Sequence, residues 1–151
     1  MAGIGVGLAG IGLVGVGLWA RWDVRRALSR ERIVVPLGPD PSTATVRSAG
    51  AARSLAEVIR ERTVEAAGGR TYAETDPYLA PDGSTTPDES SALVDERTGR
   101  PVSNPDYELW IRSTTLQSAL MQAYLAFRLA DLSMAVGASL VAAGAGIAAR
   151  R

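Results

Sequence analysis

Three residue types are missing from this chain of 151 residues: cysteine, histidine and lysine. Without cysteine and histidine there is no thiolate nucleophile, no disulfide, no imidazole acid–base catalyst and no His/Cys metal site. Iron sites built from two histidines and one carboxylate are excluded on the same ground. The sequence therefore predicts a protein that is not an enzyme and that needs no cofactor or metal.

The first segment has no charged or polar side chains at all between Ala2 and Ala20, and seven of the first seventeen residues are glycine. Nineteen residues give about 28 Å of helix, close to the hydrocarbon thickness of a bilayer. In water so much glycine destabilises a helix, whereas in lipid the backbone has no other hydrogen-bond partner. Residues 2–20 are therefore predicted to be a transmembrane helix. A cleaved signal peptide is the alternative, but the basic residues follow the apolar run, which favours a signal anchor.

A second uncharged run, residues 132–149, predicts another transmembrane helix over 129–149. Upstream of it, apolar residues recur at spacings of three and four. This pattern predicts an amphipathic stalk helix over 106–128, with Ser113 as a candidate N-cap. The stripe consists of Leu116, Leu120, Ala123, Phe127 and Ala130.

Four segments are predicted between the two spans. Residues 21–35 continue the first helix as a basic juxtamembrane helix, and 36–47 form a loop. Residues 48–67 are predicted to be a cytoplasmic helix that Gly68-Gly69 closes. Residues 68–105 are rich in Pro, Gly, Ser, Thr and acidic residues, so little fixed structure is expected there. The predicted fold class is mainly α: a transmembrane helical hairpin with a cytoplasmic helix and a largely disordered acidic loop.

The basic residues predict the orientation. Residues 21–32 carry five arginines against two acidic residues. By the positive-inside rule this cluster is cytoplasmic. We therefore expect a multi-pass protein of the cell's inner (cytoplasmic) membrane, with both termini outside and the middle region in the cytoplasm. Arg150 and Arg151 leave the reversed topology open. The same cluster is a candidate to bind anionic lipid head groups, or it only marks the topology.

Small residues form faces along both predicted spans. Such faces let helix backbones approach closely in lipid, where packing holds helices together. They predict either packing of the two spans on each other or a partner helix in a homo- or hetero-oligomeric membrane complex. Glycine covers more than one face of the first span, which indicates a second neighbour. The candidate helix-packing residues are Gly3, Gly5, Gly7, Gly10, Gly12, Gly17, Ala135, Ala138, Ala142 and Ala145.

Charged and aromatic residues gather where the spans should meet the cytoplasmic edge. Arg128 and Asp131 lie three residues apart, and an antiparallel hairpin sets Asp131 level with about residue 20. We therefore expect Asp131 to pair with Arg21 or Arg25. Neighbouring arginines favour its ionised form, which argues against a proton-carrying role. The predicted interfacial aromatic belt consists of Trp19, Trp22, Tyr124 and Phe127.

Two resemblances follow from short motifs. The first is carried by Glu31-Arg32-Ile33, Pro36, Ala56, Ile59 and Gly68-Gly69-Arg70-Thr71-Tyr72-Ala73-Glu74. It resembles a group of uncharacterised actinobacterial membrane proteins that share the two-span layout, and it implies no established activity. A ring-opening dioxygenase label found on such proteins needs histidines that this chain does not have. The glycine-alternating first span also resembles the proteolipid c-subunit of rotary ATP synthases, although about a hundred residues separate the two spans here.

The sequence thus predicts an integral membrane structural or accessory subunit that uses small-residue helix faces for packing and assembly. The alternative is an ion- or proton-conducting oligomeric hairpin in which Asp131 is the titrating carboxylate. The expected partners are the lipid bilayer and a membrane helix, and no nucleic acid.

Overall fold

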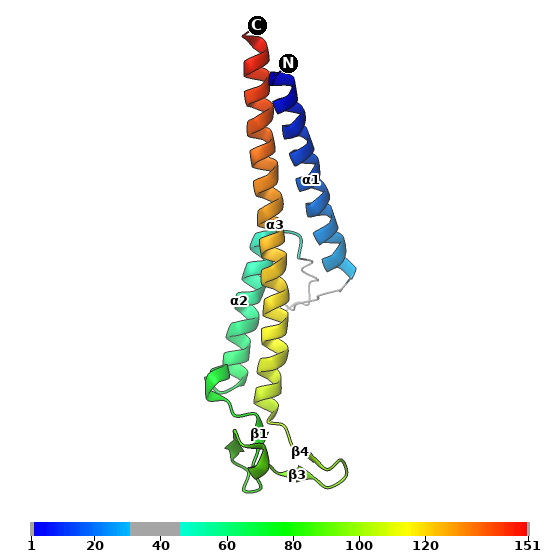
Figure 1. Ribbon diagram of the computed structural model, residues 1–151. Coiled ribbons are helices and arrows are strands. Elements are labelled where there is room, and N and C mark those ends of the chain that lie inside the picture. The colour runs from blue at the N-terminus through cyan, green and yellow to red at the C-terminus, as the bar shows by residue number, and fades with distance from the viewer. Residues whose placement is uncertain (1, 31–45, 151) are drawn as a thin grey trace. The chain divides into compact units, whose positions relative to one another are not determined.

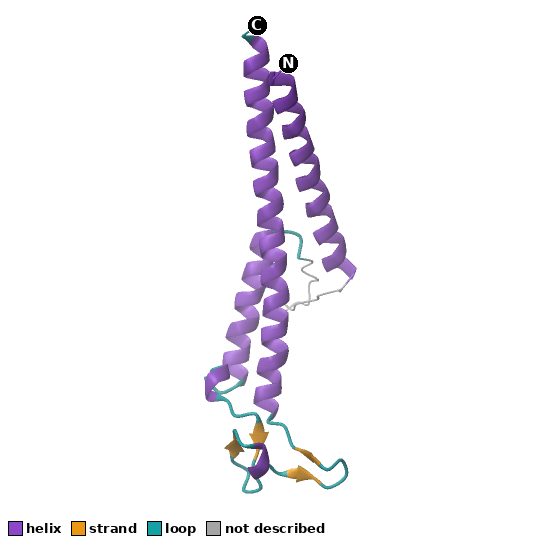
Figure 2. Ribbon diagram, viewed as in Figure 1, coloured by secondary structure: helices purple, strands orange, loops and turns teal. Residues whose placement is uncertain are grey.

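The computed structural model describes residues 2–30 and 46–150, and these are mainly helical, as predicted. Figure 1 labels the three helices of the described residues, and Figure 2 shows the short strands in the segment that links the second helix to the third. The helices are α1 (Ala2–Arg30), α2 (Ala49–Ala66) and α3 (Pro105–Ala149).

The contacts divide the chain into two units. The first comprises Met1–Leu55 with Leu120–Arg151, and the second comprises Ala56–Ala119. Both α2 and α3 contribute residues to each unit. The first unit contains the helical hairpin, and the second contains the strands.

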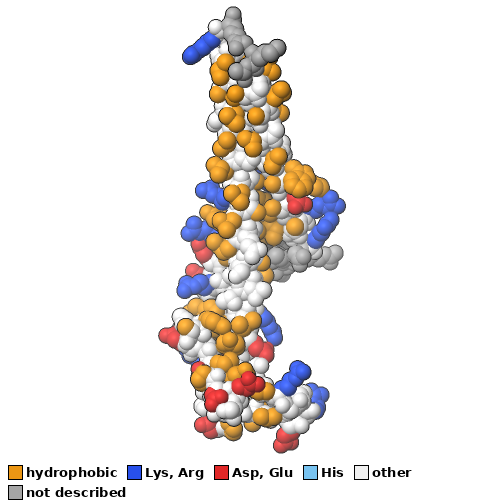
Figure 3. Space-filling model, in the orientation of Figure 1, with side chains coloured by type: hydrophobic (Ala, Val, Ile, Leu, Met, Phe, Trp, Pro, Cys, Tyr) orange, Lys and Arg blue, Asp and Glu red, His pale blue; other side chains and the backbone are white. Residues whose placement is uncertain are grey.

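Both α1 and α3 are long and apolar enough to cross a membrane. Few residues of their most apolar stretches are buried within the chain. Large side chains such as Ile4, Leu8 and Leu132 are 59–65% exposed. Figure 3 shows hydrophobic side chains along the visible surface of the hairpin. A soluble helix buries one apolar stripe, whereas lipid accepts an apolar surface all round.

The helix α1 continues to Arg30 without a break, so the first basic residues extend the first span as a helix. The predicted continuation to residue 35 and most of the predicted loop 36–47 lie outside the described residues. The next described residue is Val46, which is buried in the first unit.

Local hydrogen bonds fix both ends of α2. The Ser48 hydroxyl oxygen accepts from the Ala51 amide at 3.2 Å, which caps the N-terminus. At the other end the Gly69 amide donates to the Val64 carbonyl at 2.8 Å and the Gly68 amide donates to the Glu65 carbonyl at 3.1 Å. This is a Schellman motif, and it needs the positive φ of +65° that Gly68 adopts.

The expectation of little fixed structure in 68–105 is wrong. Two antiparallel hairpins occupy this segment, and Leu93 links them through backbone hydrogen bonds to Leu79 and Val102 of 2.7 and 2.8 Å. Two 3₁₀ turns complete the segment. The hairpins pair β1 (Tyr78–Leu79) with β2 (Thr85–Thr86) and β3 (Val94–Asp95) with β4 (Arg100–Pro101), and the turns are η1 (Tyr72–Glu74) and η2 (Glu89–Ser91).

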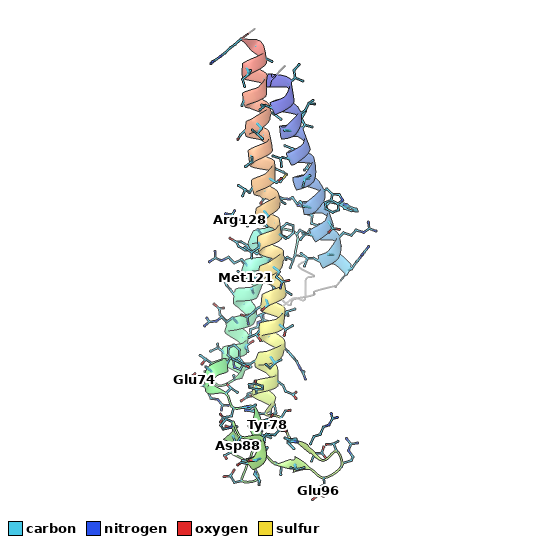
Figure 4. The ribbon with its side chains drawn as sticks, in the orientation of Figure 1. Glu74, Tyr78, Asp88, Glu96, Met121 and Arg128 are labelled. Carbon is cyan, nitrogen blue, oxygen red and sulfur yellow. The ribbon has the colours of Figure 1, made fainter. Side chains whose placement is uncertain are left out.

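Polar side chains, which suggested disorder, hold these turns by local hydrogen bonds. The Asp82 carboxylate accepts from the amide and hydroxyl of Ser84 at 2.9 and 2.6 Å. Asp88 accepts in the same way from Ser90, and Glu74 accepts from Thr71 (Figure 4). These hydrogen bonds lower the pKa of all three carboxyl groups, because they favour the ionised form.

The helix α3 begins at Pro105, so Ser113 is not its N-cap. Asn104 caps it, because its side-chain oxygen accepts from the Asp106 amide at 3.0 Å and proline suits the first helical position. Ser113 is instead buried in the second unit, where its hydroxyl shares a hydrogen bond of 2.5 Å with Thr63. From Pro105 the helix runs unbroken to Ala149, through the predicted stalk and the second span.

Candidate functional site

Close backbone contact between α1 and α3 is the main feature of the hairpin. A Cβ atom added to Gly10 would lie 2.6 Å from the carbonyl oxygen of Gly137, and one added to Gly3 would lie 2.9 Å from that of Gly144. At Gly17 the same atom would lie 2.7 Å from the carbonyl oxygen of Ala130. All three distances are too short for a side chain, so glycine is required wherever α1 crosses α3 at this separation.

Glycine is required on α3 as well. A Cβ atom on Gly137 would lie 2.6 Å from the carbonyl oxygen of Gly10, and one on Gly144 would lie 2.7 Å from the Gly7 amide nitrogen. The α3 face of the interface thus consists of Ala130, Gly137 and Gly144, all buried. None of the three is among the predicted helix-packing residues, although Ala130 belongs to the predicted apolar stripe. Their spacing of seven matches that of Gly3, Gly10 and Gly17, a repeat that keeps two helix faces together.

The α3 alanine face that the sequence analysis singled out does not form this interface. Ala135, Ala138, Ala142 and Ala145 are exposed on the hairpin surface. Three of them line a shallow apolar groove of about 440 Å³. The lining residues are Ile11, Val14, Ala138, Val141, Ala142 and Ala145.

The second glycine row of α1 is also open. A Cβ atom on Gly5 or on Gly12 would meet nothing within 4 Å among the described residues, and the same holds for Gly15. Gly7 lies beside Gly144 but also has room for a Cβ atom. The glycines of α1 therefore fall into two sets: an inner set, Gly3, Gly10 and Gly17, and an outer set, Gly5, Gly12 and Gly15.

Two polar contacts fix the hairpin register. The Arg21 guanidinium forms an ion pair with the Asp131 carboxylate. Of the two arginines proposed as partners of Asp131, Arg21 is therefore the one that pairs with it. Deeper in the hairpin, the Ser133 hydroxyl donates to the Leu13 carbonyl oxygen at 2.9 Å. Both contacts join α1 to α3 in the antiparallel sense that the glycine contacts also define.

The other boundary residues lie apart from this pair. Arg25 donates from Nε to the Arg47 carbonyl oxygen at 3.1 Å, and Arg128 is exposed on α3 (Figure 4). Trp19 and Trp22 are 64% and 54% exposed. Tyr124 is partly buried.

Phe127 does not belong to an exposed belt. It is only 1% exposed, because it lies on the stripe of α3 that faces inward. The buried apolar residues of the first unit are Val46, Ala52, Leu55, Leu120, Ala123, Phe127 and Ala130.

A basic hollow of about 460 Å³ lies at the C-terminal end of α1. Three arginines line it together with one tryptophan and one serine. The Arg26 guanidinium lies 5.0 Å from the centroid of the Trp22 ring, within the range of a cation–π contact. The described residues that line it are Trp22, Arg25, Arg26, Ser29 and Arg47.

In the second unit, contacts join the segment after α2 to the start of α3. Tyr72 and Tyr107 stack at 5.4 Å, and their hydroxyl groups share a hydrogen bond of 2.9 Å that raises the pKa of Tyr107. Arg70 forms a 2.6 Å ion pair with Asp106. These contacts hold the second unit together.

Comparison with known proteins gives no match: no protein-family model, no curated protein and no solved structure is similar to this chain.

Proposed function

We propose that this chain is an integral membrane structural or accessory subunit without catalytic activity. Its α1–α3 hairpin lies in the cell's inner membrane and packs against a further membrane helix. The observation that carries this proposal is the division of the α1 glycines. The α3 backbone occupies the space beside Gly10, whereas Gly5 and Gly12 face open space among the described residues.

Open glycines on a membrane helix favour a neighbouring helix. Glycine provides no side chain to contact lipid, and it lets a second backbone approach closely enough for van der Waals packing and weak Cα–H···O contacts. The exposed alanines of α3 and the groove beside them offer a second strip of the same kind. Both strips therefore suit contact with one or two membrane helices, from another copy of the chain or from another protein.

The orientation that goes with this function has both termini outside and the middle region, residues 21–128, in the cytoplasm. The arginines at the end of α1 support it through the positive-inside rule. The chain has no native cysteine, so a single Ser84→Cys variant reports the location of the β1–β2 turn. A membrane-impermeant maleimide should label it only after the cells are opened. Labelling of intact cells would show that the orientation is the opposite one.

The Arg21–Asp131 ion pair supports a packing role over ion or proton conduction. The Asp131 carboxylate is bound to the Arg21 guanidinium of the same hairpin, so it takes part in a contact that joins α1 to α3. The pair also lies at the end of the glycine interface, where it fixes the hairpin register. Proton flux that is lost in Asp131→Asn would favour conduction instead.

Co-purification tests the proposed assembly. The tagged chain, extracted in mild detergent, should retain a membrane partner or a second copy that mass spectrometry identifies. The Gly5→Leu Gly12→Leu variant should lose this partner while its level in the membrane is unchanged. Retention of the same partners by the variant would contradict the proposal.

A further inference from the structure

From the basic hollow at the end of α1 we infer a binding site for the phosphate of an anionic phospholipid. The hollow is lined by Trp22, Arg25, Arg26, Ser29 and Arg47. The helix α1 contributes four of these residues, and Arg47 comes from the segment that precedes α2. The inference rests on the membrane location of the hairpin but not on its assembly with a partner.

The charge of the hollow requires an anion. Three guanidinium groups line it, and none of the described residues that line it is acidic. The nearby Asp131 is already paired with Arg21. Like charges gathered in one hollow repel one another, and a bound phosphate removes that repulsion.

The guanidinium groups in the hollow are hydrogen-bond donors, and two of the arginines are held in place. Among the described residues, Arg25 uses only its Nε–H, on the Arg47 carbonyl, which leaves the N–H groups of its two terminal nitrogens. Arg26 lies over the Trp22 ring, and stacking leaves the in-plane N–H groups of a guanidinium available. Ser29 bonds back to the carbonyls of Arg25 and Arg26, so its hydroxyl hydrogen is already used. Guanidinium forks match phosphate oxygens in geometry.

The position of the hollow favours a lipid over a free phosphate. Trp22 is exposed and marks the level of the membrane interface. Arg25 and Arg26 follow about 5–6 Å further along the helix axis. Lipid phosphates lie at this level, directly outside the hydrocarbon. Acyl chains attached to that phosphate would lie along the apolar surface of α1.

Native mass spectrometry of the full chain in mild detergent tests the site. The probes are phosphatidylglycerol and phosphatidylcholine with the same acyl chains. The wild type should retain phosphatidylglycerol in preference. Each arginine near a lipid surface contributes about fivefold in affinity, so Arg26→Gln with Arg47→Gln should weaken binding about 25-fold. Neither of these side chains donates a hydrogen bond within the described part of the chain, so the variant should keep the helix content of the wild type by circular dichroism.

The matched control removes the same charge elsewhere. Arg30 lies on α1 and Arg128 on α3, and both are exposed and outside the hollow. Arg30→Gln with Arg128→Gln should weaken phosphatidylglycerol binding clearly less than Arg26→Gln with Arg47→Gln does, because neither side chain lines the hollow. If the control lost as much phosphatidylglycerol binding, the effect would come from general surface charge, and the proposed site would be wrong. Equal binding of phosphatidylcholine would overturn it too.

A competition arm separates lipid from free anion. Excess inorganic phosphate should leave the phosphatidylglycerol bound. Displacement by phosphate, with phosphate itself retained, would assign the hollow to a soluble anion and overturn the lipid proposal. The same spectra report the number of chains in each complex. Failure of assembly with retained lipid selectivity is therefore distinguishable from failure of the lipid site in an intact assembly.

Discussion

The hairpin of α1 and α3 and the unit of residues 56–119 both require glycine, for different physical reasons. At Gly10 the α1 backbone is ordinary helix, and the missing Cβ atom leaves room for the carbonyl of Gly137. At Gly68 there is open space around the residue, and the requirement is its φ of +65°, which other residues adopt at a cost. The first requirement comes from a partner helix and the second from the local backbone.

The polar contacts of the two regions differ in the same way. The hairpin is joined by long-range contacts, such as Arg21 with Asp131 and Ser133 with the Leu13 carbonyl. In the second unit, short-range hydrogen bonds of Asp82 and Asp88 fix turns within two or three residues. Close packing with few polar groups suits lipid, whereas exposed local hydrogen bonds suit water. The predictions below test this contrast.

The largest effect is expected at the inner glycines. Gly10→Leu adds a side chain whose Cβ atom alone would lie 2.6 Å from the Gly137 carbonyl oxygen, so the two helices must separate. We expect the hairpin to be destabilised by more than about 3 kcal/mol, beyond the usual range for overpacking. Urea unfolding in mild detergent measures the change. Gly15→Leu is the matched control on the same helix, because a Cβ atom there meets nothing in the described chain. Equal stability of the two variants would contradict the close contact between α1 and α3 at Gly10.

A smaller effect is expected at the end of α2. Gly68→Ala keeps the space open but forces a left-handed backbone on alanine, at a cost of about 1 kcal/mol. Gly50→Ala is the control in the same helix, where a Cβ atom meets nothing and the backbone is helical. This variant should be neutral or more stable, by up to about 1 kcal/mol. Thermal unfolding of both variants measures the difference, and a destabilised Gly50→Ala with a neutral Gly68→Ala would contradict the assignment.

The boundary ion pair should contribute less again. A double-mutant cycle of Arg21→Gln and Asp131→Asn should give a coupling energy of about 1 kcal/mol, because both side chains are partly exposed. The parallel cycle with Arg25→Gln should give none, since Arg25 contacts the Arg47 carbonyl instead. Equal coupling for both arginines would show that the interaction is diffuse charge rather than a pair.

The smallest effect is a response of the second unit to acid. The pKa values of Asp82 and Asp88 are lowered by hydrogen bonds from serines. Their ionised forms therefore stabilise the turns above the ordinary aspartate pKa of about 3.9, and this contribution is lost as pH falls through the lowered pKa. The amide NMR shifts of Ser84 and Ser90 should move only below that ordinary value. A midpoint at or above it would contradict the hydrogen bonds, and Asp82→Asn should abolish the Ser84 transition.

Much of the hairpin is predictable from the sequence, because apolar runs and small residues act over the whole length of a helix. Equal residue counts from the outer ends of an antiparallel hairpin predict that Asp131 lies level with the first arginines, and the structure pairs it with Arg21. The α3 face was missed for a specific reason. Alanines at steps of three and four outnumber the α3 glycines, but the α3 face follows a spacing of seven. On it Gly137 and Gly144 admit the α1 backbone, and Ala130 lies against Gly17.

The acidic segment was missed because composition does not report local hydrogen bonds. Asp, Ser and Thr lower the apolar content, which predicts disorder, yet the same residues cap turns when they stand two or three apart. Asp82 with Ser84 and Asp88 with Ser90 have this spacing. The start of α3 shows the same signal, since Asn104 followed by proline is a stronger N-cap than the buried Ser113.

The central claim is that the two glycine sets of α1 serve two different contacts, and the native mass of the complex tests it most directly. The wild type in mild detergent should be larger than one chain, and Gly5→Leu Gly12→Leu should fall to the monomer mass. In that variant a bis-maleimide cross-link between Leu13→Cys and Ser133→Cys should still form, because the inner contact is intact. A monomeric wild type, or an unchanged mass in the variant, would contradict the account.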